Sequence, residues 1–139
     1  MPALVIEASL ASAWCFPDER TEYANRALQA IASGLEAFAP RLWAYEIRNS
    51  VLMGSRRGRI SKADAQEFLT ALNDLPVRLS DPPSYDAVFG LAGQYSLTFY
   101  DAAYLDLAIH NGLALASLDK ALCRAGERAG VRLFDPAVA

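Results

Sequence analysis

Short apolar runs alternate with longer amphipathic stretches along most of the chain. Residues 3–6 and 113–118 are continuous apolar runs, which are typical of strands buried on both faces of a sheet. Residues 38–40, 77–79 and 131–134 are further extended candidates. Because strands that alternate with helices usually pair in parallel, this pattern predicts an α/β fold with a mostly parallel central sheet flanked by helices.

Helices are predicted between these runs. We expect them over residues 17–33, 41–57, 61–73, 84–95, 98–111 and 120–129. The first would begin at Pro17 with Asp18 as its cap and end at Gly34, while Ser61 and Ser84 would cap two later helices. The sequence contains no internal repeat or linker, so we predict one domain over residues 1–139.

The helix that follows Thr98 carries an acid at the start of its apolar stripe. At helical spacing Asp101 shares a face with Leu105, Ala108 and Ile109, so we expect its carboxylate to point toward the interior. A charge in that position needs a cation, an ionic partner or several hydrogen bonds. The alternative is a structural acid in a first helical turn, where acids are common.

Two further acids occupy equivalent places in the predicted topology. Glu7 follows the first strand, and Asp119 follows the strand over 113–118. The carboxyl ends of parallel strands form the edge where ligands bind, so both acids are candidates for a pocket there. Glu7 as a solvated acid and Asp119 as a helix cap are the alternatives.

The helix predicted over 41–57 has two stripes of different character. One stripe is apolar and consists of Trp43, Ile47, Val51 and Gly54. The other consists of Leu42, Glu46, Asn49 and Met53. Glu46 and Asn49 therefore lie one turn apart in an otherwise apolar row, as expected of a polar pair that faces a shared site. An internal hydrogen-bonded pair or exposure to solvent is the alternative.

Several carboxylates in one pocket predict a divalent cation. They would repel one another, and Mg²⁺ or Mn²⁺ relieves that repulsion with the oxygen ligands that it prefers. His110 is the only histidine, and Cys15 and Cys123 form no Cys-x-x-Cys pair, so neither a zinc site nor a disulfide framework is expected. Metal-bound acids suit phosphodiester hydrolysis, because the cation activates water and stabilises the leaving oxygen.

The charge distribution limits the class of partner. A net charge of −3 argues against a broad basic surface for nucleic acid. Arg56, Arg57 and Arg59 form the densest basic patch available for phosphate contact, although they also complement the end of a helix dipole. No apolar run is long enough to cross a membrane and residues 1–16 lack the basic start of a signal peptide, so we expect a cytoplasmic protein.

Four motifs in this order resemble those of the PIN domain ribonucleases, and more narrowly the VapC toxins of bacterial toxin–antitoxin modules. They are residues 5–9 with 13–17, residues 45–49, residues 98–104 and residues 117–119, and the turn over 56–61 is also similar. The resemblance covers nearly the whole chain. It implies a single PIN domain with an acidic pocket at the carboxyl ends of the strands.

The resemblance also implies an activity and partners. It implies Mg²⁺-dependent cleavage of RNA of the tRNA or ribosomal RNA class, a homodimer, and inhibition by a VapB-type antitoxin in a higher assembly. By position Glu7, Glu46, Asp101 and Asp119 match the four acids of the family. The first acid is usually Asp, and here it is Glu, one methylene longer.

We therefore expect a metal-dependent endoribonuclease. Glu7 and Asp101 would be the main metal ligands, and Asp119 would complete the metal shell directly or through water. Glu46 would orient the attacking water or a second cation. Asn49 would fix Glu46, and Thr98 would be a further supporting residue. The first alternative is an attenuated domain that mainly binds a protein partner, which Glu7 favours. The second is a response-regulator-like phosphoacceptor, which is disfavoured because only Lys120 is available as its lysine.

Overall fold

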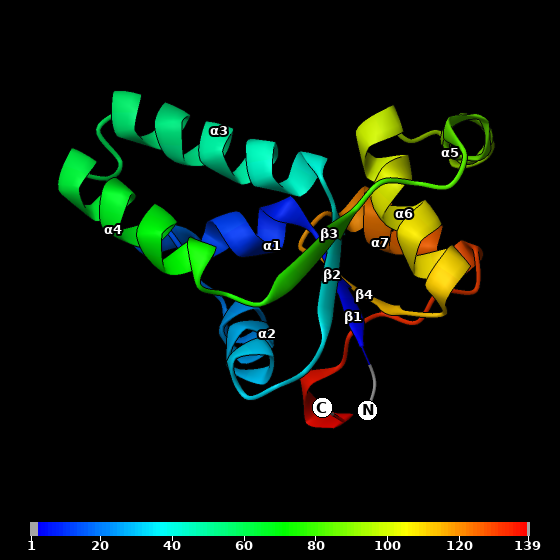
Figure 1. Cartoon of the computed structure of the whole chain (residues 1–139), viewed down its shortest axis with the longest axis horizontal. Coiled ribbons are helices and arrows are strands. Elements are labelled where there is room, and N and C mark those ends of the chain that lie inside the picture. The colour runs from blue at the N-terminus through cyan, green and yellow to red at the C-terminus, as the bar shows by residue number, and fades with distance from the viewer. Residues whose placement is uncertain (1–2, 139) are drawn as a thin grey trace.

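A four-stranded parallel sheet lies at the centre of the computed structural model, which describes residues 3–138 (Figure 1). Its strands are β1 (Leu4–Ile6), β2 (Ala37–Pro40), β3 (Val77–Ser80) and β4 (Ala114–Ala116). Their spatial order is β3-β2-β1-β4, and Val5 is in register with Phe38 on one side and Leu115 on the other. All three pairings are parallel, which confirms the predicted α/β fold.

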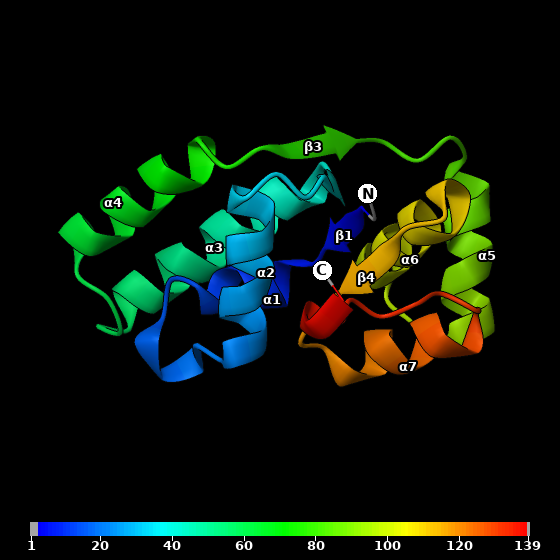
Figure 2. The same ribbon diagram turned by 90° about the horizontal axis from the view of Figure 1, so that it is seen from below.

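Within residues 3–138, seven α-helices flank the sheet on both sides. They are α1 (Ala8–Ala13), α2 (Glu22–Ala32), α3 (Leu42–Arg56), α4 (Lys62–Asn73), α5 (Tyr85–Tyr95), α6 (Phe99–Asn111) and α7 (Lys120–Arg128), and two short 3₁₀ turns are η1 (Pro17–Glu19) and η2 (Pro136–Val138). Helices α1 to α4 lie on one side of the strands and α5 to α7 on the other, as Figure 2 also shows. The carboxyl ends of β1 and β4 are therefore enclosed by helices from both sides.

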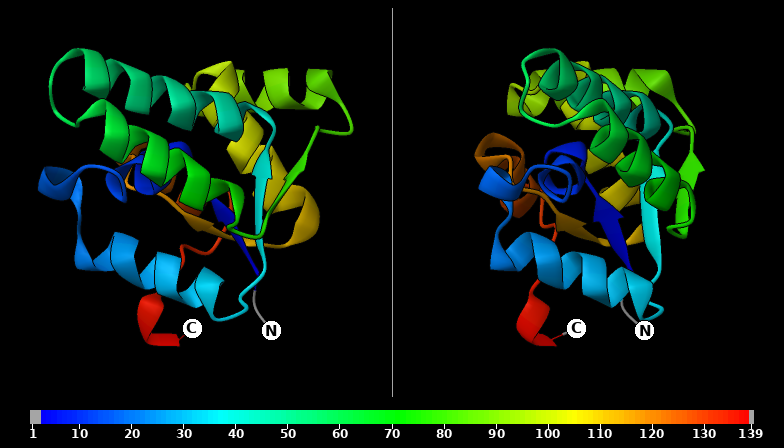
Figure 3. Two further views of the ribbon diagram at one scale, coloured as in Figure 1. Left: turned by 60° about the vertical axis from the view of Figure 1, so that its left-hand side comes forward. Right: turned by 90° about the vertical axis from the view of Figure 1, so that its left-hand side faces the viewer.

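Helices α3 and α4 form an antiparallel hairpin that extends beyond the sheet (Figure 3). Gly58, with φ of +74°, makes the turn between them, because a left-handed backbone conformation costs glycine little. Ser61 then caps α4 by accepting a hydrogen bond of 3.0 Å from the amide of Asp64. The turn that holds the predicted basic patch is thus built from local chain preferences.

Side-chain caps define the helices around the strand ends. Ser84 caps α5, Thr98 caps α6 and Asp119 caps α7, each by accepting a hydrogen bond from a backbone amide three residues later. These caps confirm the helix starts predicted at Ser84, Thr98 and Asp119. The apolar stripe of α3 over Trp43, Ile47, Val51 and Gly54 is buried, as predicted.

The first predicted helix was wrong in its boundaries. The sequence pattern favoured one helix from Pro17 with Asp18 as cap, but residues 8–13 already form α1, and residues 17–19 form only η1. Thr21 is the cap of α2, because its hydroxyl accepts the amide of Ala24 at 3.0 Å while Arg20 before it is extended. The small, mostly apolar side chains of α1 are buried under α3, so no amphipathic period marked this helix in the sequence.

Two further expectations were corrected by the tertiary structure. The strand predicted over 131–134 is reduced to one parallel bridge between Leu133 and Leu115, because the backbone of this segment hydrogen-bonds to β4 only at Leu115, which donates to the Arg132 carbonyl and accepts from the Phe134 amide. Ile109 is 42% exposed rather than facing the core with Leu105, which is fully buried. Within residues 3–138, no helix is both long and apolar enough to span a membrane.

Candidate active site

The four acids predicted from the sequence line one cleft of about 530 Å³. They are Glu7, Glu46, Asp101 and Asp119. Each comes from a different segment: the end of β1, the middle of α3, the first turn of α6 and the loop before α7. Asn49, Arg57 and Arg59 line the same cleft, whereas Arg56 and Thr98 lie outside its lining. The fold therefore brings together residues that are more than 110 positions apart.

Glu7 is buried, and both of its carboxylate oxygens accept hydrogen bonds. Its side chain is 5% exposed and is the N-cap of α1. Oε2 accepts the amide of Ser9 at 2.8 Å, and Oε1 accepts the hydroxyls of Ser9 and Ser117, both at 2.5 Å. The longer side chain of Glu7 is thus folded back onto the protein as a structural cap as well as a wall of the cleft.

The two serines extend this network to Asp119. The Ser9 hydroxyl accepts the amide of Leu118 at 3.2 Å, and the Ser117 hydroxyl accepts the amide of Asp119 at 2.9 Å. These bonds join the end of β1 to the end of β4 and fix the backbone on which Asp119 stands. The sequence analysis did not select Ser9 or Ser117, although both belong to the motifs that carried the family resemblance.

Asp119 has two roles in this geometry. Its Oδ1 accepts the amide of Leu122 at 3.0 Å and caps α7. The same side chain lines the cleft. The capping alternative and the site assignment are therefore compatible, because a carboxylate has two oxygens and the cap occupies one of them.

Asp101 is held at the start of α6. Its amide donates to the hydroxyl of Thr98 at 3.0 Å, which places its half-buried carboxylate in the first helical turn. Burial raises the pKa of Asp101, and the negative charges of Asp119 and Glu7 raise it further. The negative charges of Asp119 and Glu7 therefore act on Asp101 across the cleft.

Glu46 is linked to α6 by a buried tyrosine that sequence reasoning missed. The Tyr104 hydroxyl donates a hydrogen bond of 2.7 Å to Oε1 of Glu46. Burial raises the pKa of Glu46, the hydrogen bond from Tyr104 opposes that change, and the charges of Glu7 and Asp101 raise the pKa again. Tyr104 follows Asp101 by three residues on the same helix, and this spacing was the available signal.

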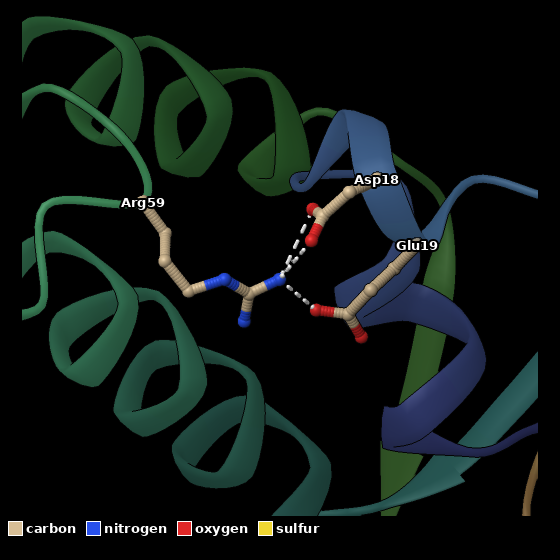
Figure 4. A network of polar contacts seen from close by, with 3 residues as sticks. All are labelled: Asp18, Glu19 and Arg59. Carbon is tan, nitrogen blue, oxygen red and sulfur yellow. Dashed lines mark hydrogen bonds and ion pairs between the residues drawn. The ribbon is translucent and has the colours of Figure 1, made fainter.

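Asn49 and the arginines occupy other parts of the cleft. Asn49 lies almost one helical turn beyond Glu46 on α3, while the hydrogen bond to Glu46 comes from Tyr104. Arg57 and Arg59 follow at the end of this helix and in the turn after it. Arg59 contacts the carboxylates of Asp18 and Glu19 (Figure 4).

The cleft also contains an unsatisfied polar atom. The hydroxyl of Ser12 is buried and has no hydrogen-bond partner among the described residues, although its residue lines the cleft. A buried hydroxyl without a partner is costly, so this position favours a polar ligand or water. Across residues 3–138, no three side chains of His, Cys, Asp or Glu are close enough to enclose a metal ion by themselves.

The histidine and the cysteines lie outside this cleft. His110 Nδ1 is 3.4 Å from Oδ1 of Asp106, a buried acid one turn earlier on α6. Cys15 is buried and Cys123 is half-buried, and both are free thiols. The candidate chemistry of the cleft therefore depends on oxygen donors and arginines.

Comparison with known proteins decides the family. The model of the PIN domain family matches residues 4–128. This chain belongs to the PIN domain family. It is 36% identical over 123 residues to "Ribonuclease VapC3" of Pyrobaculum aerophilum, which covers 86% of this chain and 91% of that protein. It is also 37% identical over 78 residues to "Exonuclease VapC9" of the same organism, across 56% of this chain and 58% of that protein. This PIN domain is therefore homologous to VapC ribonucleases.

Solved structures show the same fold at lower sequence identity. PAE2754 from Pyrobaculum aerophilum superposes with a TM-score of 0.70 and 24% identity, over 89% of this chain and 84% of that one. FitAcB from Neisseria gonorrhoeae superposes with a TM-score of 0.65 and 15% identity, over 98% of this chain and 99% of that one. VapC20 of Mycobacterium tuberculosis superposes with a TM-score of 0.60 and 14% identity, over 89% of this chain and 95% of that one. It is described as a sarcin-ricin loop cleaving toxin. These likenesses establish a PIN-like fold.

Proposed function

We propose that this PIN domain is a metal-dependent endoribonuclease toxin that acts in the cytoplasm on structured RNA and is inhibited by a cognate antitoxin. The observation that carries the proposal is the convergence of Glu7, Glu46, Asp101 and Asp119 on one cleft. Homology to VapC3, which is named a ribonuclease, supports the reaction class. The likeness to VapC20, a sarcin-ricin loop cleaving toxin, supports structured RNA of the ribosomal or tRNA class as the substrate.

The residues of the cleft fit Mg²⁺ or Mn²⁺. Their donors are carboxylate, hydroxyl and amide oxygens, which are the ligands that these cations prefer. Burial raises the pKa of Asp101 and Glu46 and the charges of the other acids raise it further, and a nearby cation would oppose this rise because it favours the ionised carboxylates. Because the protein does not by itself enclose an ion with three such side chains, water would supply further ligands, as Mg²⁺ commonly requires.

Each residue has a proposed role in RNA cleavage. Asp101 and Glu7 would hold the cation, and Asp119 would complete its shell directly or through water. The cation would supply an activated water and stabilise the leaving oxygen. Glu46, with a raised pKa and a carboxylate fixed by Tyr104, is suited to orient that water and accept its proton. Asn49 lies beside this position as a further hydrogen-bonding group.

The arginines have proposed roles toward RNA. Arg57 and Arg59 line the cleft, which supports a role for both in contacting phosphates next to the bond that would be cut. Arg56 lies in the last turn of α3 outside the cleft lining, where it would contact a more distant phosphate. Thr98 would act indirectly, because its cap on α6 fixes Asp101.

Replacement of Asp101 tests the proposed function. Asp101→Asn keeps the shape of the side chain but loses the charge that attracts the cation, so we expect loss of Mn²⁺ binding and of Mg²⁺-dependent RNA cleavage with the fold retained. Binding is measured by calorimetry and cleavage on purified ribosomal RNA and tRNA. Asp106→Asn is the matched control outside the cleft. Cleavage by Asp101→Asn at the parent rate would refute the proposed metal site.

A small VapB-type antitoxin is the proposed partner. It would place an Arg or Lys among the four acids and pack an amphipathic segment against the protein. Coexpression with the small open reading frame next to this one should yield a stable complex in which RNA cleavage is blocked. Recovery of the protein alone, harmless to the cell, would contradict this partner.

A homodimer is proposed on the distribution of exposed apolar side chains. Every exposed large hydrophobic side chain in the described part of the chain is on α3, α5 or α6: Tyr45, Leu52, Tyr85, Phe89, Phe99, Tyr100 and Ile109. A second copy that covers these helices would remove apolar surface from water. Sedimentation of the parent as a dimer and of Phe89→Asp as a monomer would support this arrangement, and a monomeric parent would contradict it.

Attenuated catalysis with a binding function is the second candidate. The observation that favours it is the engagement of both Glu7 oxygens by Ser9 and Ser117. A carboxylate held by three hydrogen bonds is a weaker competitor for a cation than a free one. An antitoxin complex without detectable RNA cleavage by the free parent protein would support this candidate.

A further inference from the structure

A cluster of three charged residues lies at the edge of the acidic cleft, and we name it the Arg59 ion cluster. It consists of Arg59 in the turn after α3 and of Asp18 and Glu19 in η1 (Figure 4). One guanidinium nitrogen, Nη2, makes all the contacts: 3.1 Å to each oxygen of Asp18 and 2.5 Å to Oε2 of Glu19. No partner of Nε or Nη1 is present among residues 3–138.

The backbone and an aromatic ring hold Arg59 in this position. Its amide donates to the carbonyl of Gly54 at 2.9 Å, and its guanidinium lies over the Phe16 ring at 4.3 Å from the centroid. The Phe16 ring also lies against α3 at Gly54, where an added Cβ would be 2.4 Å from two of its ring carbons. The guanidinium is therefore oriented before any ligand arrives, with the N–H donors of Nε and Nη1 still available.

Arg59 lies on the boundary between two clefts. It lines the acidic cleft, together with Arg57 and Glu19. It also lines a second cleft of about 480 Å³ between η1 and α4, which includes Arg20, Ser61 and Phe68. A chain of phosphates that leaves the acidic cleft past η1 would pass this guanidinium.

We propose that Asp18 and Glu19 compete with RNA for Arg59 and so weaken the binding of the phosphodiester next to the cleavage site. This inference rests on the proposed ribonuclease function. Two carboxylates face one guanidinium, so the cluster carries a net negative charge, which opposes the approach of a phosphate. All three side chains are at least one-third exposed, and exposed ion pairs are weak, so a phosphate that binds the fork of Arg59 can replace them at small cost.

The inference predicts that Arg59 contributes little to RNA affinity while its acids are present and more once they are removed. A double-mutant cycle combines Asp18→Asn with Glu19→Gln and, separately, Arg59→Gln. All proteins also carry Asp101→Asn, so that the RNA stays intact in Mg²⁺. The probe is a fluorescein-labelled single-stranded RNA of twelve nucleotides, measured by fluorescence anisotropy over a range of salt concentrations.

We expect the Asp18→Asn, Glu19→Gln protein to bind this RNA about three- to fivefold more tightly at low salt, as the release of one exposed ion pair allows. Its salt dependence should be steeper by about 0.7 in log–log slope, which corresponds to one added phosphate contact on a single strand. Arg59→Gln should remove this gain in the substituted protein and change the affinity less than about twofold when the acids are present.

The matched control removes two carboxylates from arginine pairs outside the cleft. Glu22→Gln with Asp81→Asn changes the net charge equally and releases Arg26 and Arg41. An equal gain in RNA affinity in the control protein would overturn the inference and would show a general charge effect. A gain in affinity that persists after Arg59→Gln would do the same. RNA cleavage by the protein with Asp101 intact is measured in parallel. If the protein cleaves RNA but the Asp18→Asn, Glu19→Gln substitutions bring no gain in RNA affinity, the inference alone is overturned. If the protein neither cleaves nor binds RNA, the proposed function is overturned as well.

Discussion

The hydroxyl of Tyr104 donates a hydrogen bond of 2.7 Å to Glu46 and thereby joins α6 to α3 beside the acidic cleft. Tyr104 is fully buried, and burial together with this bond raises the pKa of Tyr104, so the phenol remains a neutral donor. Glu46 itself is half-buried. A core residue of α6 thus holds a proposed catalytic acid on another helix, and its hydrogen bond opposes the rise in the pKa of Glu46 that burial causes.

Tyr104→Phe should therefore raise the pKa of Glu46. The hydrogen bond lowers this pKa against the larger effect of burial, so its removal leaves burial and the repulsion from Glu7 and Asp101 unopposed. We expect the acidic limb of the pH–rate profile of RNA cleavage to move to higher pH, with a loss of about 1 kcal/mol in stability. Tyr45→Phe is the control, because Tyr45 is 78% exposed. An unchanged acidic limb would show that Glu46 does not control the rate.

Asp101→Asn should stabilise the metal-free protein at neutral pH. Because the pKa of Asp101 is raised in the folded protein, ionisation is less favourable there than in the unfolded chain. Folded stability is thus greatest below the unfolded pKa of Asp101 and falls as the pH rises through the folded value. The substitution should raise Tm at pH 7 and have little effect near pH 3. Differential scanning calorimetry in EDTA checks this. In saturating Mn²⁺ at pH 7 the parent protein should instead have the higher Tm, because only the parent retains the proposed metal site. A lower Tm at pH 7 in EDTA would contradict the repulsion.

Glu7→Asp should raise RNA cleavage. The shorter side chain withdraws by ~1.5 Å, retains the capping position before α1 and moves away from the Ser117 hydroxyl. Since a displacement of about 1 Å can change a rate on the order of 10²-fold, an increase of about tenfold or more is expected on one defined RNA at saturating Mg²⁺. Ser117→Ala is the matched variant, because it removes one of the two hydroxyl donors to Glu7 Oε1, leaves the Ser9 hydroxyl in place and does not shorten the side chain. An equal or slower rate in Glu7→Asp would mean that the cleft is adapted to Glu.

Gly54→Ala should destabilise the protein although alanine favours helices. An added Cβ would lie 2.4 Å from two carbons of the Phe16 ring, and overpacking of this kind costs about 1–3 kcal/mol. Gly90→Ala on α5 is the control, because its Cβ would meet no atom within 4 Å and should stabilise by roughly 0.5–1 kcal/mol. Urea unfolding of both variants measures the difference. A stabilised Gly54→Ala would contradict the close contact between α3 and Phe16.

The sequence alone determined the class of fold and the identity of the four acids. Buried runs at 3–6 and 113–118, alternating with capped helices, were sufficient for a parallel sheet, because hydrophobic periodicity and caps are local signals. Glu7 and Asp119 followed from their places after strands, since parallel strands present their carboxyl ends at one edge. Asp101 and Glu46 followed from their positions in otherwise apolar helical rows.

Tertiary structure alone decided how these acids are held. Whether Glu7 faced solvent, a cation or the protein depended on Ser117, which is 110 residues away in the chain. The contact of Tyr104 with Glu46 and the pairing of Arg59 with Asp18 and Glu19 likewise join segments that no local pattern relates. Helix α1 escaped prediction because its side chains are buried on nearly every side, which erases the helical period of polar and apolar positions. Local propensity thus specified the elements, while packing between distant segments determined the ionisation and engagement of each functional group.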